Sequence, residues 1–291
     1  VEVCAFIGSS RIRAVAEDWD LDGMVEHSRT AIRFCVENDM PCMYVTEDTT
    51  RAHPDTLRTL YLAAIEEGAR RVCVSDTVGH ATPEGAAAVV RFVRELVDGT
   101  GEQVKVDWHG HRDRGLGLSN CLAALRAGAD RIHGTALGIG ERCGNAEMDV
   151  LLVNLKLLGW IDRDLQSLPE YCALASRATG TPIPSQYPVV GPDAFETATG
   201  VHASAVVKAL RRGDPWLANR VYSGVPADEF GLAQRISVGP MSGRSNVSFF
   251  LESRGLAADD ETVGRVLEKA KSTPRVLTET EVLEAAGLDA T

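Results

Sequence analysis

The sequence predicts an α/β fold in which repeated β-strand and α-helix units build a parallel sheet, either closed as a barrel or open. Over the first 160 residues, short apolar or β-branched segments alternate with longer segments of helical periodicity. The short segments begin about 30 to 40 residues apart, which leaves room for a helical crossover between parallel neighbours. Five strands are expected, at Val3 to Ile7, Cys42 to Thr46, Val72 to Ser75, Val104 to Trp108 and Arg131 to Thr135.

Helix signals between these strands agree with the same period. Pro54 is expected to begin a helix that ends before Gly68, and the dipeptide Thr82-Pro83 is expected to begin the next one. Segments 68–72 and 128–132 both have the pattern of a helix end followed by a strand start. This faint internal repeat supports successive strand-helix units.

The pattern changes after Trp160, where helices and loops replace the regular alternation. We therefore expect a first region over 1–160 and a second, mainly helical region over 161–291. The segment from Glu261 to Leu288 is expected to form two short amphipathic helices.

Composition is typical of a soluble globular protein. Of 291 residues, 44% are hydrophobic and 24% charged, and the net charge of −11 argues against a nucleic-acid-binding surface. Seven cysteines form an odd set, and several lie in apolar segments, which favours a reducing, cytoplasmic location. No apolar segment approaches the length of a membrane span, so we expect no membrane contact.

Two histidines follow one of the expected strands as Trp108-His109-Gly110-His111. Because side chains alternate along a strand, both imidazoles face the same way and could form half of a metal site. An ordinary pair of polar residues at a strand end fits this motif about as well. The following Arg112-Asp113 lacks the spacing of a kinase catalytic loop, and the glycines at 138–144 lack that of a dinucleotide site.

Polar residues collect at the carboxyl end of each expected strand, where parallel barrels build their active sites. Any one of them is weak evidence, but their convergence favours an active site over a purely structural pattern. The residues are Ser9, Ser10, Arg11 and Arg13 after the first strand, Thr46, Glu47 and Asp48 after the second, Asp76 and Thr77 after the third, and Thr135, Glu141 and Asn145 beyond the fifth.

Four motifs then occur in a characteristic order: Glu47-Asp48-Thr49, Asp76-Thr77-Val78-Gly79, His109-Gly110-His111, and Gly-Ile-Gly-Glu-Arg-Cys-Gly-Asn at 138–145. In this order and spacing the chain resembles the acetyl-CoA-dependent 2-oxo acid synthases, which include isopropylmalate, homocitrate and citramalate synthases. Two later segments, 194–202 and 239–243, also resemble motifs of that family. The resemblance therefore covers nearly the whole chain.

The resemblance implies a metal-dependent (β/α)8 TIM barrel followed by helical lid subdomains, working as a homodimer. It implies a divalent cation (Mg, Mn or Zn) bound by His109, His111 and Asn145. A cation of this kind would polarise the carbonyl of a 2-oxo acid before acetyl-CoA attacks it. Glu47 and His202 match the acid and base of the family, without an indication of which is which. The expected substrate contacts are Thr77, Arg11, Arg13, Thr46 and Thr135.

Two departures from the family pattern stand out. The family's opening Arg-Asp or Arg-Glu motif, which supplies an acidic metal ligand, is absent, and a common histidine is replaced by Thr197. In the family's order the first strand here would be the fourth, so three strand-helix units are unaccounted for. We expect the functional polypeptide to extend before Val1 and to supply the acidic ligand.

Two alternatives remain beside the synthase interpretation. A lyase of the hydroxymethylglutaryl-CoA type would use the same metal barrel for the reverse reaction, the cleavage of a carbon-carbon bond. A non-catalytic relative that binds an acyl ligand would explain the missing acidic residue. Within the synthase interpretation, the 2-oxo acid is open between 2-oxoglutarate, 2-oxoisovalerate, pyruvate and a phosphonate-substituted analogue.

Overall fold

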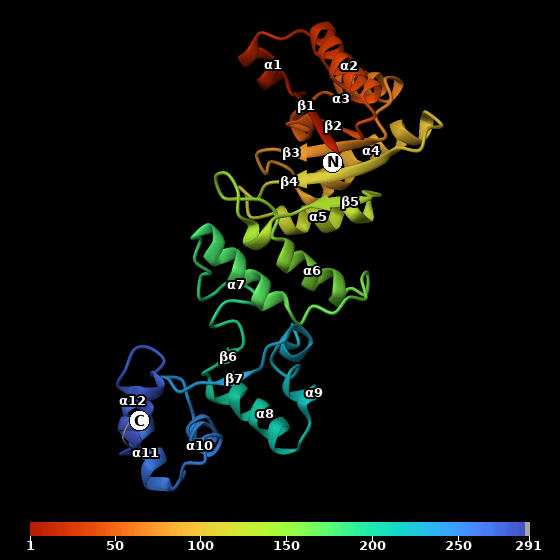
Figure 1. Cartoon of the computed structure of the whole chain (residues 1–291). Coiled ribbons are helices and arrows are strands. Elements are labelled where there is room, and N and C mark those ends of the chain that lie inside the picture. Colours follow the sequence, from red (N-terminus) through yellow and green to blue (C-terminus); the bar gives the residue numbers. More distant parts are fainter. Residues whose placement is uncertain (289–291) are drawn as a thin grey trace. The chain divides into compact units, whose positions relative to one another are not determined.

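The computed structural model describes residues 1–288 and divides into two compact units, Val1–Leu152 and Val153–Thr291 (Figure 1). Each unit has its own buried side chains, and helix α6, Met148–Leu157, contains the boundary between them. The first unit contains every expected site residue except His202.

A five-stranded parallel sheet forms the centre of the first unit, with its strands in the order β1-β2-β3-β4-β5 (Figure 1). The prediction of five parallel strands is confirmed, with each end within two residues of its expected position. Strands β1 and β5 lie at the two edges of the sheet. The strands are β1 Val3–Gly8, β2 Cys42–Glu47, β3 Arg71–Asp76, β4 Lys105–Gly110 and β5 Arg131–His133.

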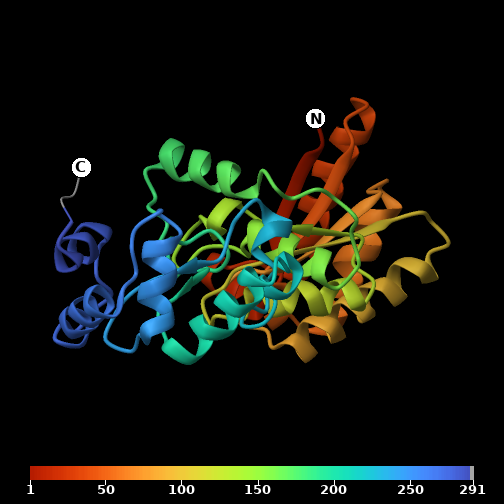
Figure 2. The same cartoon turned by 90° about the horizontal axis from the view of Figure 1, so that it is seen from below.

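Helices follow the strands and pack against one face of the sheet, as Figure 2 shows for the orange and yellow-green segments. Side chains of alternate strand residues fill this interface, and Tyr44, Val74 and Trp108 are at most 1% exposed. Pro54 and Pro83 begin helices as predicted. The elements are α1 Arg11–Glu17, α2 Leu21–Glu37, η1 Thr49–Arg51, α3 Pro54–Glu66, α4 Pro83–Gly99, α5 Gly117–Arg126, η2 Ala136–Gly138 and α6 Met148–Leu157.

The second unit is mainly helical and contains one small parallel sheet of two strands. The two predicted C-terminal helices are confirmed as α11 and α12, which share a buried apolar cluster with α10. The elements are α7 Leu168–Thr179, β6 Glu196–Thr197, α8 Gly200–Arg211, α9 Pro215–Ala218, η3 Ala227–Phe230, β7 Arg235–Ile236, α10 Arg244–Glu252, α11 Asp260–Lys271 and α12 Glu279–Ala286.

Within residues 1–288, none of the helices combines the length and the apolar character needed to cross a bilayer.

Candidate active site

The register of the sheet determines which side chains share the face opposite the helices. Gly8 pairs with Glu47 across β1 and β2, Ser75 pairs with His109 across β3 and β4, and His109 pairs with His133 across β4 and β5. Because paired residues of parallel strands point to the same side, these residues form one row near the carboxyl end of the sheet.

A pocket of about 380 Å³ lies over this row. It brings together four of the expected site residues, which are the carboxylate of Glu47, the hydroxyl of Thr77 and the imidazoles of His109 and His111. Its lining is Cys4, Phe6, Met43, Val45, Glu47, Cys73, Ser75, Thr77, His109, His111, His133 and Glu141.

The two imidazoles of the His-x-His motif lie edge to face, with ring centroids 5.3 Å apart. Burial, and to a smaller extent the nearby His133 and His111, together lower the pKa of His109 to about 4. Burial and the charge of Arg142 also lower the pKa of His111. Both rings are therefore neutral near pH 7, which is the form that binds a metal ion.

Asn145 lies beside His111 because their segments form an antiparallel bridge, supported by a hydrogen bond from the Arg112 N–H to the Gly144 carbonyl. Nδ1 of His111 and Oδ1 of Asn145 are buried without a hydrogen-bond partner in the described part of the chain. Buried polar atoms of this kind normally have a partner, so two unpartnered atoms with lone pairs, on residues bridged to each other, fit a cation. Residues 1–288 contain no group of three His, Cys, Asp or Glu side chains placed to bind a metal.

Glu47 ends strand β2, and its side chain is about one-third exposed, at 32%. The guanidinium of Arg13 lies 3.7 Å from its carboxylate and also pairs with Glu17 at 2.8 Å. Glu47 therefore faces the pocket as a carboxylate with one cation at its edge. Arg11, in the first turn of the same helix α1, is exposed and does not line the pocket.

Thr77 is held in place by the loop that follows β3. Its Oγ1 accepts a hydrogen bond from the Asp48 N–H at 2.8 Å, which leaves the hydroxyl hydrogen available to a ligand. The preceding Asp76 is fully buried and accepts hydrogen bonds from the Thr50 hydroxyl and from the N–H groups of His80 and Ala81. Asp76 thus shapes the loop that presents Thr77.

Thr46 requires a correction, because its expected contact with substrate does not fit its position. It alternates with Glu47 and points to the helix side of the sheet, where it is fully buried and bonded to the Tyr61 hydroxyl at 2.6 Å. Thr135 lies outside the pocket lining, and its hydroxyl donates to the Ile139 carbonyl at 2.7 Å.

His202 belongs to the second unit, in the first turn of α8, where it is exposed. Its ring stacks on that of Tyr222, with centroids 4.2 Å apart. No motif predicts a role for this tyrosine, which lies 20 residues further along the chain between helices α9 and η3. Stacking holds the imidazole in a defined orientation at the surface of its unit.

A buried ionic cluster below the pocket was also not expected. Asp107 is fully buried and accepts from Arg71 and Arg131 at 2.6 Å each and from Nε2 of His133 at 2.9 Å. Burial raises the pKa of this carboxyl, but the hydrogen bonds from His133, Arg71 and Arg131 outweigh burial and leave the pKa below its ordinary value. Asp107 therefore stays ionised in the interior.

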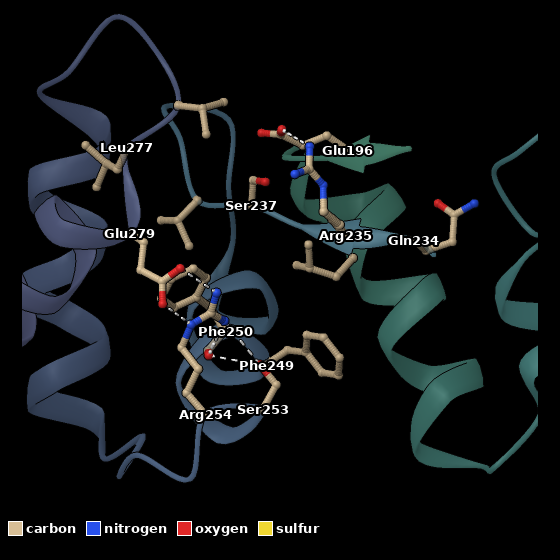
Figure 3. A pocket seen from close by; sticks show the side chains of 13 residues that line it. Glu196, Gln234, Arg235, Ser237, Phe249, Phe250, Ser253, Arg254, Leu277 and Glu279 are labelled. Atoms are coloured by element: carbon tan, nitrogen blue, oxygen red, sulfur yellow. Dashed lines mark hydrogen bonds and ion pairs between the residues drawn. The ribbon is translucent and has the colours of Figure 1, made fainter. Parts of the chain in front are cut away.

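The second unit has a cavity of its own, of about 370 Å³, between β7, α10 and the start of α12 (Figure 3). Its charged side chains are already paired with each other: Arg235 with Glu196 at 3.1 Å, and Arg254 with Glu279 at 2.8 Å. None of the expected catalytic or metal-binding residues lines it. We therefore place the candidate active site in the first unit.

The fold and this site define the class of protein. The family described as HMGL-like matches residues 1–174, and the chain belongs to that family. Two solved structures show the same fold: hydroxymethylglutaryl-CoA lyase from Pseudomonas aeruginosa (TM-score 0.55, 16% identity) and the HMG-CoA lyase from Brucella melitensis (TM-score 0.52, 18% identity). The first match covers 62% of this chain and 64% of that one, and the second 61% and 66%. The predicted barrel family and α/β fold are confirmed.

Relatives in sequence carry the names of synthases. From Methanopyrus kandleri, a probable 2-isopropylmalate synthase is 32% identical over 85% of this chain, and a putative (R)-citramalate synthase is 33% identical over 87%. A homocitrate synthase from the same organism is 32% identical over 86%. The matches cover 47%, 48% and 60% of those proteins, so the chain spans about half the length of the curated relatives it matches.

Proposed function

We propose that this chain carries the active site for the condensation of acetyl-CoA with a 2-oxo acid. The product is a 2-hydroxy-2-(carboxymethyl) acid, and hydrolysis of the thioester releases CoA. The observation that carries the proposal is the meeting of Glu47, Thr77, His109 and His111 in one pocket at the carboxyl end of a parallel sheet. Relatives named as synthases of three such acids support it.

His109, His111 and Asn145 are the residues that would hold a divalent cation, through two imidazole nitrogens and an amide oxygen. When bound, the cation supplies Lewis-acid polarisation of the carbonyl of the 2-oxo acid. The hydroxyl of Thr77 would donate a hydrogen bond to the carboxylate of the same substrate. Its oxygen already accepts a hydrogen bond from the Asp48 N–H, so its hydrogen is available for this contact. These residues together bind and orient the electrophile.

Glu47 and His202 would provide the proton transfers. One group removes a proton from the methyl group of acetyl-CoA, and the resulting carbanion forms a bond to the carbonyl carbon of the 2-oxo acid. The other group gives a proton to the oxygen that becomes the tertiary hydroxyl. The guanidinium of Arg13 lies 3.7 Å from the carboxylate of Glu47, at the edge of the pocket. The whole enzyme is expected to work as a homodimer.

The side chain of the 2-oxo acid is proposed to be uncharged and largely apolar. In the row of residues below Glu47 and His109, Phe6 pairs with Val45 and Val45 with Cys73, all on the pocket face. Desolvating a second carboxylate against such a surface would cost free energy without a compensating partner there. A branched or short aliphatic side chain would gain free energy from the same contact.

The test is a thiol-release assay with acetyl-CoA and a panel of 2-oxoisovalerate, pyruvate and 2-oxoglutarate. We expect release with 2-oxoisovalerate or pyruvate, and loss of it in a His111→Ala variant. Preference for 2-oxoglutarate would contradict the apolar side chain and leave the condensation standing. Failure of every 2-oxo acid, together with cleavage of hydroxymethylglutaryl-CoA, would replace the synthase with a lyase.

A further inference from the structure

The imidazole of His109 is held in place without a hydrogen bond. No side-chain hydrogen bond to this ring occurs within residues 1–288, although a metal-binding histidine usually donates its second ring nitrogen to a carboxylate or carbonyl group. The ring lies instead between two other imidazoles. His111 packs against it edge to face at 5.3 Å between centroids, and His133 packs against it at 5.7 Å with a tilt of 59°.

The His133 ring is anchored by the buried cluster below it. Nε2 of His133 donates to Oδ2 of Asp107 at 2.9 Å. That carboxylate cannot turn, because Arg71 and Arg131 each bind one of its oxygens at 2.6 Å and the group is fully buried. The two arginines are held in turn by Glu2, at 3.3 Å and 2.9 Å. The position of the His133 ring is therefore determined by its hydrogen bond to the immobilised carboxylate of Asp107.

We propose that Asp107 and His133 are positioning residues for His109: Asp107 fixes the His133 ring, and that ring limits the rotation of the His109 imidazole. The inference rests on the metal site of the proposed function. Packing against an anchored ring here replaces the hydrogen bond that orients metal-binding histidines elsewhere. Neither residue is one of the proposed metal ligands, so both act on the metal site through His109.

The test is a titration of the metal-free full chain with Mn²⁺. Binding is measured from the electron paramagnetic resonance signal of the free ion. Removing the ring in His133→Ala should weaken binding about 10-fold or more, the lower part of the range seen for groups that orient metal ligands. His133→Phe restores a ring against His109 but cannot bond Asp107, so its affinity should lie between those of wild type and His133→Ala. Asp107→Asn should resemble His133→Phe.

Asp130→Asn is the matched control, because Asp130 pairs with Arg94 and Lys105 at 3.0 Å each, lies in the same region of sequence before β5, and does not bond His133. It should leave the Mn²⁺ affinity unchanged. Thermal melting of each metal-free variant separates a folding defect from weaker binding. If Asp107→Asn fails to fold, the two His133 variants decide the question, since both leave the ion pairs of Asp107 intact.

Three results would overturn the inference. Equal affinity of His133→Ala and wild type would remove His133 from the positioning of His109, and equal affinity of Asp107→Asn and wild type would remove Asp107. In both cases wild type still binds Mn²⁺, so the proposed function stands. A wild-type chain that binds no Mn²⁺ would overturn the metal site of the proposed function and this role together.

Discussion

At the scale of single residues, Glu47 and Glu17 offer a direct comparison, because both carboxylates pair with the guanidinium of Arg13. Glu47→Gln should lower the rate of thiol release by about 10²- to 10⁴-fold, the usual contribution of a positioned acid or base. Glu17→Gln removes a carboxylate from the same arginine outside the pocket and should leave most of the rate. Similar rates for the two variants would take Glu47 out of the proton transfers.

The depressed pKa of His109, about 4, predicts a pH dependence of stability in the metal-free protein. The unfolded chain takes up a proton on this ring near pH 6.5, but the folded chain resists it until about pH 4. The contribution of His109 to the free energy of unfolding is therefore fully present above pH 6.5 and is lost as the pH drops toward 4. Between these values His109 should contribute a loss of at most about 1.4 kcal/mol per pH unit.

Urea unfolding at pH values from 4.5 to 7 would measure this effect in the wild-type chain and in His109→Gln. The free energy of unfolding of the variant should fall less steeply over that range, because its side chain cannot take up a proton. His53→Gln is a control, since His53 is exposed, with 72% of its side chain accessible. Equal slopes for wild type and His109→Gln would show that His109 titrates normally when folded.

At the scale of elements, the loop after β3 depends on Asp76, which accepts hydrogen bonds from Thr50, His80 and Ala81 in a fully buried position. Asp76→Ala would leave these donors without a partner, at about 1–3 kcal/mol for each buried group. We expect the free energy of unfolding to fall by about 3 kcal/mol or more. Thr82→Ala, which removes the N-cap of α4, should cost only about 1 kcal/mol. Equal losses in urea unfolding would mean that Asp76 is dispensable to the loop.

The strands themselves could be predicted because their apolar and β-branched segments repeat at regular intervals. The end of β5 could not be predicted in the same way. After His133 the chain leaves the sheet, and the Thr135 N–H donates a hydrogen bond to the Ala146 carbonyl. That partner follows the glycine-rich segment 138–145, so a pattern of neighbouring residues cannot predict the contact. Strands β6 and β7 have two residues each, too few to show an alternation.

The same limit applies to the site. His109 and His111 share a face by simple alternation, so their pairing follows from the sequence. The ionic cluster around Asp107 could not be predicted in this way. A buried acid in a strand is explained only by its ion-pair partners. Those partners lie on β3 and β5, and they can be identified only once the register of the strands is known. His133 follows the same alternation on β5 and could have been added to the site with His109.

At the scale of the whole molecule, the proposed function divides between the two units. The pocket with its metal-binding residues lies within Val1–Leu152, whereas His202 lies within Val153–Thr291. Each unit has its own fully buried side chains, such as Leu60 on α3 in the first and Leu251 on α10 in the second. Calorimetric unfolding is therefore expected to show more than one transition.

Leu251→Ala tests that division, because it creates a cavity in the second unit alone and should cost about 2–5 kcal/mol there. The variant should lose thiol release at temperatures where its second unit has unfolded, since His202 is then displaced. Its Mn²⁺ affinity should equal that of wild type, because His109 and His111 lie in the first unit. Leu60→Ala is the matched control and should lose both Mn²⁺ binding and thiol release as the first unit melts, because the pocket lies in that unit. Weaker Mn²⁺ binding by Leu251→Ala at a temperature where both units are folded would mean that the second unit supports the metal site.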